Sequence, residues 1–164
     1  MVKNVKWFFV VLLVFSSLIS LSFQGEGVRA DRLASGDKIP ALRLCQSQPL
    51  SLQTAREGYT LLSFWASYDA VSREKNAALL HEAARMAGVK VVSVSFDRYA
   101  SVFRASVQQD HLDEDCCFVE TEGSDSEVFR DFALEQGFTN FLIDGNGVIV
   151  AKNISASDLV SFIN

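Results

Sequence analysis

The stretch that decides the fold runs from Leu61 to Ser72 and reads L-L-S-F-W-A-S-Y-D-A-V-S. Its first half belongs to an apolar run, Tyr59–Ala66, which is too short for a helix and predicts a buried strand. Alanines recur at helical spacing over Ser72–Ala87 and predict a helix there. Gly88 is expected to end that helix as its C′ residue. Asp69 would then stand at the helix N-terminus, where a carboxylate can accept hydrogen bonds from free N–H groups.

Strand and helix patterns alternate along the rest of the chain. Val89–Phe96 is rich in β-branched residues and predicts a second buried strand. D-G-N-G at 144–147 is a strong hairpin signal, and Ser124 followed by Glu127 predicts a capped helix start. The other expected elements are a short edge strand at 42–44, a short strand or turn at 49–52, helices at 99–109, 124–136 and 155–163, and strands at 116–119, 138–143 and 148–151. This order predicts an α/β fold with a sheet covered by helices on both faces.

The N-terminus carries a targeting pattern. Lys3 and Lys6 precede an apolar run, Trp7–Ile19, which has the length of a secretory signal and is short for a membrane span. Cleavage is expected after Ser22. Residues 1–22 are therefore predicted to be a signal peptide, with an uncleaved signal anchor as the alternative.

The remainder divides into a polar linker, residues 23–35, and one domain, residues 36–164. We expect an exported domain in the periplasm or another oxidising, extracytoplasmic space, with membrane contact only through an uncleaved leader. The formal net charge is −5, and loss of the two leader lysines makes it −7, with 13 basic against 20 acidic residues. This excess of negative charge argues against nucleic acid or an anionic membrane surface as a partner.

Four segments resemble the TlpA-like and redoxin-type periplasmic thiol–disulfide oxidoreductases of the thioredoxin superfamily. They read G-D-K-I-P-A-L-R-L at 36–44, L-L-S-F-W-A-S-Y at 61–68, V-V-S-V-S-F-D at 91–97 and F-T-N-F-L-I-D-G-N-G-V-I at 138–149. The family patterns that they resemble include G-x-x-A-P-x-F-x-L, L-L-N-F-W-A-S-W and P-T-x-F-L-I-D-x-x-G-x-I. The resemblance implies a thioredoxin-like three-layer fold with a mixed central sheet and an N-terminal strand extension.

The sequence departs from the family at the positions that carry its chemistry. The two cysteines of the family's C-x-x-C motif fall on Asp69 and Ser72, and its cis-proline falls on Phe138. Neither Asp69 nor Ser72 can take part in disulfide exchange, which needs a thiolate and a partner sulfur. A non-proline cis peptide costs ~3 kcal/mol, so we expect Phe138 to be trans and the groove beside it to be reshaped. The resemblance therefore implies a degenerate active site.

The three cysteines of the chain, Cys45, Cys116 and Cys117, lie away from that site. Three interpretations stay open. They are small buried hydrophobic residues, they form a structural disulfide within the adjacent pair or from Cys45, or they make a relocated redox site.

No cofactor or metal site is indicated, because the sequence lacks nucleotide-binding glycine loops, serine-hydrolase motifs and zinc spacing. His81 is predicted on a helix surface. D-H-L-D-E-D at 110–115, around His111, is predicted to be a solvated acidic loop, because it lacks the spacing of a calcium loop.

Three functions compete. The favoured one is a non-catalytic, exported protein that binds a peptide or protein partner in the envelope through a groove around Trp65, Tyr68 and Phe138. The second is a thiol–disulfide oxidoreductase that uses Cys116 and Cys117, with or without Cys45. The third is a structural subunit of an envelope complex. The sequence thus favours a binding protein over an enzyme.

Overall fold

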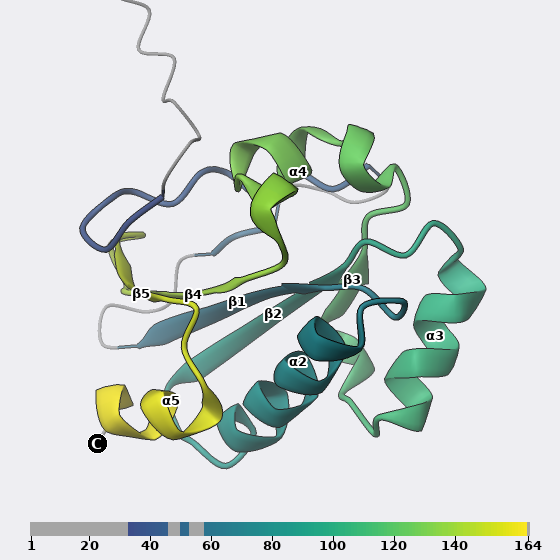
Figure 1. The fold of residues 1–164 in the computed structure, drawn as a ribbon. Helices are drawn as coiled ribbons and strands as arrows, with labels where there is room; N and C mark the ends of the chain where they lie inside the picture. Colours follow the sequence, from purple (N-terminus) through teal and green to yellow (C-terminus); the bar gives the residue numbers. More distant parts are fainter. Residues whose placement is uncertain (1–32, 46–49, 53–57, 164) are drawn as a thin grey trace, which may run out of the picture.

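A computed structural model describes residues 33–45, 50–52 and 58–163, and a five-stranded mixed sheet forms its centre (Figure 1). The strand order is β3-β2-β1-β4-β5. β1 pairs in parallel with β2, and β2 with β3, whereas the β1–β4 and β4–β5 pairs are antiparallel. The predicted α/β class and the hairpin at one edge are confirmed. The strands are β1 (Tyr59–Trp65), β2 (Val89–Ser95), β3 (Cys117–Val119), β4 (Asn140–Ile143) and β5 (Ile149–Lys152).

Helices cover both faces of this sheet, as predicted. α2 (Ala70–Ala83), α3 (Ala100–Gln109) and α5 (Ala156–Ile163) pack on one face, and α4 (Glu127–Asp131) lies on the other (Figure 1). Three short 3-10 helices lie in the connections between α3 and β4. They are η2 (Glu114–Cys116), η3 (Gly123–Asp125) and η4 (Leu134–Gln136). In the described part of the chain, no helix combines the length and apolar character that crossing a membrane requires.

The side chains of β1 alternate between the two faces of the sheet, so they contribute to a separate core on each face. Phe64 points to the α4 face, where its ring packs edge-on against Phe132 at 4.8 Å between centroids. Trp65, the next residue, points to the opposite face and packs with Leu80 of α2 and Val107 of α3. Successive strand residues must face opposite sides of a sheet, so this short run anchors both layers.

Two helix boundaries differ from the prediction. α2 ends at Ala83, with Ala84 as its C-cap, so Gly88 is not the C′ residue. The chain leaves the helix through tighter i→i−3 hydrogen bonds, such as Met86 N–H to the Ala83 carbonyl (3.0 Å). Gly88, at φ +81°, instead supplies the left-handed turn that leads into β2.

The helix predicted over 124–136 is broken into shorter pieces. Ser126, rather than Ser124, caps α4 by accepting a hydrogen bond from the Phe129 N–H at 3.2 Å. Ala133 then adopts a left-handed conformation (φ +51°), which ends the helical path. The capping-box interpretation of Ser124 with Glu127 was therefore wrong by two residues.

The N-terminal segment pairs with the sheet edge only briefly. The Ile149 N–H donates to the Asp37 carbonyl (2.9 Å) and the Ile39 N–H to that of Gly147 (2.9 Å), but pairing stops at Pro40, which has no N–H to donate. The expected strand at 42–44 is reduced to an isolated Leu42–Leu50 bridge.

The folded part also begins earlier than predicted. Leu33, which the sequence assigned to the linker, is buried in the core on the α4 face. The predicted leader and most of the linker lie outside the described residues, as does part of the strand expected at 49–52.

Candidate functional site

The N-terminus of α2 carries Asp69 and Ser72, the positions onto which the resemblance places the family's two cysteines. The Asp69 carboxylate caps the helix, accepting hydrogen bonds from the backbone N–H groups of Val71 (3.2 Å) and Ser72 (3.3 Å). The Ser72 hydroxyl is buried; it donates to the Asp69 carbonyl (3.2 Å) and accepts from the Ala66 N–H (3.4 Å). Both side chains therefore bind backbone groups within the turn, and Asp69 is the helix cap that the sequence predicts.

Trp65 was predicted to line a partner-binding groove, and the structure contradicts this. Its side chain is 0% exposed, and its indole N–H donates to the Ser93 hydroxyl (2.9 Å), which donates in turn to Asn76 Oδ1 (2.9 Å). The reason is the position of Trp65 on β1, which directs it between α2 and α3. It is a core residue with its polar atom satisfied.

Tyr68 and Phe138 do lie together at the surface. Their ring centroids are 6.4 Å apart, and Tyr68 is 73% exposed. Phe138 is half-buried and stacks on Phe96, with centroids 5.6 Å apart and an interplanar angle of 27°. The peptide bond before Phe138 is trans, as predicted. Phe138 therefore joins the exposed Tyr68 to the aromatic core.

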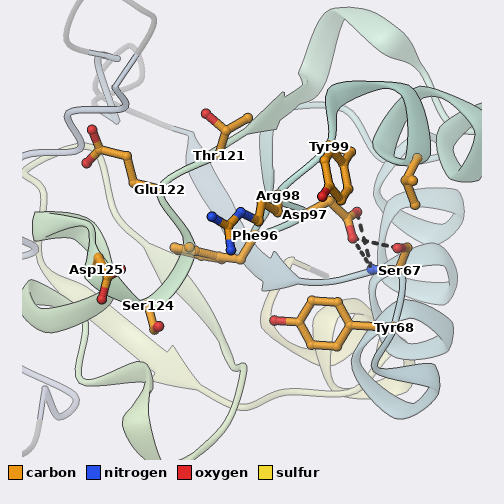
Figure 2. Close-up of a pocket in the computed structure, with 12 residues that line it drawn as sticks. Ser67, Tyr68, Phe96, Asp97, Arg98, Tyr99, Thr121, Glu122, Ser124 and Asp125 are labelled. Atoms are coloured by element: carbon orange, nitrogen blue, oxygen red, sulfur yellow. Dashed lines mark hydrogen bonds between the residues drawn. The ribbon is translucent and has the colours of Figure 1, made fainter.

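An open pocket of about 610 Å³ lies beside Tyr68, at the carboxyl ends of β1, β2 and β3 (Figure 2). Its walls come from Ser67 and Tyr68 after β1, residues 96–99 after β2 and residues 121–125 after β3. The crevice outside the carboxyl ends of parallel strands is where open α/β sheets usually bind ligands. It is the best-placed binding site that the described residues offer.

Asp97 forms part of this pocket, although only 2% of it is exposed. Its carboxylate accepts hydrogen bonds from the Ser67 N–H (3.1 Å) and the Ser67 hydroxyl (2.5 Å) (Figure 2). It accepts a third from the Ser95 hydroxyl (2.6 Å). Within the described ranges, no Lys or Arg pairs with it. Sequence reasoning assigned Asp97 no role, though a carboxylate directly after a buried strand was a usable signal.

The surroundings of Tyr68 keep its phenol protonated. Partial burial raises the pKa of Tyr68 above its ordinary value, and the nearby carboxylates of Asp97 and Asp69 raise it further. The hydroxyl is therefore a neutral hydrogen-bond donor at the mouth of the pocket.

A salt bridge ties α2 to the end of α3. Arg73 Nε lies 2.7 Å from Asp110 Oδ2, and a second nitrogen lies 2.7 Å from Oδ1. This hydrogen-bonded carboxylate raises the pKa of Arg73. The prediction of a solvated loop for 110–115 is therefore wrong for Asp110, which pairs with Arg73.

The histidine on α2 contacts the same segment, since His81 Nε2 lies 3.1 Å from the Asp110 carbonyl. Among the described residues, no group of three or more His, Cys, Asp or Glu side chains could hold a metal ion.

The cysteines lie at the end of the sheet. Cys117 is buried and Cys116 half-buried, and both pack on the α2–α3 face. The neighbouring Cys117 thiol lowers the pKa of Cys116, and the same interaction together with burial raises the pKa of Cys117. The Cys116 thiol donates a hydrogen bond to the Asp113 carbonyl (3.2 Å). Cys45 is exposed, with its sulfur 3.4 Å from Thr121 Oγ1. All three are free, so the structure contains no bridge among them.

Solved structures share this fold. A thioredoxin-like protein from Parabacteroides distasonis is 36% identical, with 79% of this chain and 94% of that chain covered and a TM-score of 0.73. The thioredoxin domain of a thiol-disulfide oxidoreductase from Bacteroides vulgatus is 20% identical (81% and 100% covered, TM-score 0.65). A thiol-disulfide oxidoreductase from Bacteroides fragilis is 23% identical (79% and 96%, TM-score 0.58), and these last two show the fold alone. No protein-family model and no curated protein matches the sequence.

Proposed function

This chain belongs to the thioredoxin superfamily, and we propose that it is a non-catalytic member that binds an extended peptide of a protein partner in the cell envelope. One observation carries the proposal. The two positions that hold the superfamily's reactive sulfurs are occupied by Asp69 and Ser72, whose polar atoms are engaged in closing the turn. The scaffold is kept, and the groups needed for disulfide exchange are absent from it.

The surface beside that turn supports a binding role. Tyr68 stands 73% exposed at the edge of the pocket and is backed by Phe138 rather than left isolated. An aromatic ring with a polar tip, held by packing beside a cavity, is the kind of residue that anchors a partner.

Export is the second part of the proposal. It rests on the basic and apolar pattern of residues 1–22, which lie outside the described residues. Fractionation of the producing cell tests it. We expect the chain in the extracytoplasmic fraction with its mass reduced by the leader. Recovery in the cytoplasm at full mass would contradict export.

Peptide selection tests the binding role. The purified chain is used to select binders from a random peptide library, and their affinities are measured by fluorescence anisotropy. We expect Tyr68→Ala to weaken binding about 30-fold, the effect of losing a hot-spot residue worth ~2 kcal/mol.

Phe162→Ala is the matched control, because Phe162 is also an exposed aromatic (42%) but lies on α5 outside the pocket. Phe162→Ala should bind the selected peptides as tightly as the unmodified chain does. In a separate assay, the unmodified chain should reduce insulin no faster than the background rate. Failure to select any peptide, or equal binding by Tyr68→Ala, would overturn the proposal.

One observation favours the oxidoreductase alternative, namely that two free cysteines, Cys116 and Cys117, are adjacent and that the pKa of Cys116 is lowered. Alkylation of the native protein, before and after a mild thiol reductant, separates the two functions by mass. Three cysteines alkylated without reductant exclude redox cycling. A pair that opens with the reductant and re-forms readily would make the oxidoreductase reading the better one.

A further inference from the structure

Carboxylates dominate the charge of the pocket beside Tyr68. Asp97 lies on one wall, and Glu122 and Asp125 lie on the other, across the open space from Tyr68 (Figure 2). None of these three carboxylates forms an ion pair with a Lys or Arg of the described residues. Asp97 is largely buried and its carboxylate accepts hydrogen bonds from Ser67 and Ser95, so it contributes negative charge to the wall of the pocket.

Aromatic rings line the same space. Tyr68 and Tyr99 are 73% and 67% exposed, and Phe96 lies between the two walls. Tyr99 is the N-cap residue of α3, and its side chain makes no capping hydrogen bond there. Ring faces attract an ammonium or guanidinium within about 6 Å, and carboxylates add to that attraction. Aromatic and acidic groups that face one another across a cavity suit one cationic group.

Arg98 carries a positive charge, which would repel a cationic group in the pocket. It is the one basic residue among the described residues that line the pocket, and it is exposed. Three carboxylates against one guanidinium leave the lining with an excess of negative charge. The balance therefore favours a basic ligand over an acidic one.

We infer that this pocket recognises a Lys or Arg side chain of the bound peptide, held between the Tyr68 and Tyr99 rings and the carboxylates of Asp97, Glu122 and Asp125. The inference rests on the proposed peptide-binding function and specifies its partner. It explains why the cavity combines exposed aromatic residues with an excess of carboxylates over basic groups. The peptide backbone would cross the open side of the pocket beside Phe138.

Peptides selected on the unmodified chain provide the test. We expect one position to be enriched in Lys or Arg, and replacement of that residue by norleucine to weaken binding about tenfold. The Glu122→Gln/Asp125→Asn variant should lose the same factor, because each exposed ion pair contributes up to ~1 kcal/mol. Both losses should shrink as the ionic strength rises.

Arg98→Gln is the matched charge control. It removes a repelling charge from the same cavity, so basic peptides should bind as well as before or a few-fold more tightly. Weaker binding by Arg98→Gln, together with selected peptides rich in Asp or Glu, would show that Arg98 is the recognising group and overturn the inference. Cadaverine, a free diamine, provides a further control. If it displaces the peptide at a concentration equal to that of the peptide, the pocket binds a free amine rather than a peptide side chain, and the inference is overturned.

The inference can fail while the proposed function stands. Selected peptides that need Tyr68, but show no basic position and bind Glu122→Gln/Asp125→Asn unchanged, would overturn the charge preference alone. Failure to select any peptide would overturn both.

Discussion

Thiol–disulfide chemistry requires sulfur and an environment that stabilises a thiolate, and two regions of this chain each have one of these. The first region is the turn from Ala66 to Ser72, and the second is the segment from Asp113 to Cys117. The turn stands at the N-terminus of a 14-residue helix, where the dipole stabilises an anion, but it contains no sulfur. The second segment contains two adjacent thiols, but Cys116 ends a 3-10 turn, and Cys117, which begins a three-residue strand, is buried. Reactivity depends on the environment as well as on the sulfur.

The first region is held by hydrogen bonds at the helix start. The Asp69 carboxylate accepts from two backbone N–H groups, and the Ser72 hydroxyl donates to the Asp69 carbonyl. A helix N-terminus stabilises a carboxylate for the same reason that it stabilises a thiolate, because both are anions. The same terminus can therefore hold a structural cap or a reactive group.

The largest expected effect is the restoration of sulfur to the first region. Asp69→Cys/Ser72→Cys should gain insulin-reducing activity that the unmodified chain lacks. A helix N-terminus lowers a cysteine pKa to about 7 or below, so roughly tenfold more thiolate is present at pH 7 than for an ordinary thiol.

Ser72→Cys alone is the control, since a single thiol cannot complete the cycle. A folded but inactive double variant would show that the scaffold itself has lost competence. Adding Phe138→Pro would then test whether the groove is responsible.

The next effect concerns the two aromatic residues that flank the turn. Trp65→Ala should lower the free energy of unfolding by ~3–5 kcal/mol, because it empties a packed site and removes the partner of Ser93. Tyr68→Ala should change it by less than ~0.5 kcal/mol, as expected for an exposed side chain. Urea denaturation measures both, and similar values for the two variants would contradict the assignment of one to the core and one to the binding surface.

A smaller effect is expected at the helix cap. Asp69→Ala removes the acceptor for two backbone N–H groups and should cost about 1 kcal/mol. The melting temperature should fall by about 4 °C, as followed by circular dichroism. Asp69→Ser should retain most of the stability because serine also caps helices. A loss as large for serine as for alanine would mean that Asp69 stabilises the turn through its charge rather than its hydrogen bonds.

The smallest effect is a pH shift in the second region. The Cys117 hydrogen bond lowers the pKa of Cys116, so Cys116 keeps its thiolate, and its reaction with iodoacetamide, to lower pH than an ordinary thiol. Cys117→Ala removes that donor and should move the rate profile to higher pH, whereas Cys117→Ser keeps a donor and should move it less. An unchanged profile in Cys117→Ala would show that the contact does not tune Cys116.

Several elements could be predicted from the sequence because they depend on neighbours within a few residues. The Asp69 cap needs only the helix that follows it, and the β4–β5 hairpin needs only the D-G-N-G turn, in which Gly147 adopts φ +78°. Other local signals misled because two candidates compete at short range. Ser124 and Ser126 both suit a helix cap, and the geometry of η3 favours Ser126.

The sequence by itself determined the α/β class, the resemblance to thioredoxins and the absence of sulfur at positions 69 and 72. Only the tertiary structure decided that Trp65 is core, since the face to which a strand residue points depends on the layers around the sheet. It alone joined Asp97 to Ser67, 30 positions apart, and set Glu122 and Asp125 across the same cavity. Parallel strands bring their carboxyl ends together irrespective of sequence separation, so a site built there becomes apparent only when the sheet is assembled.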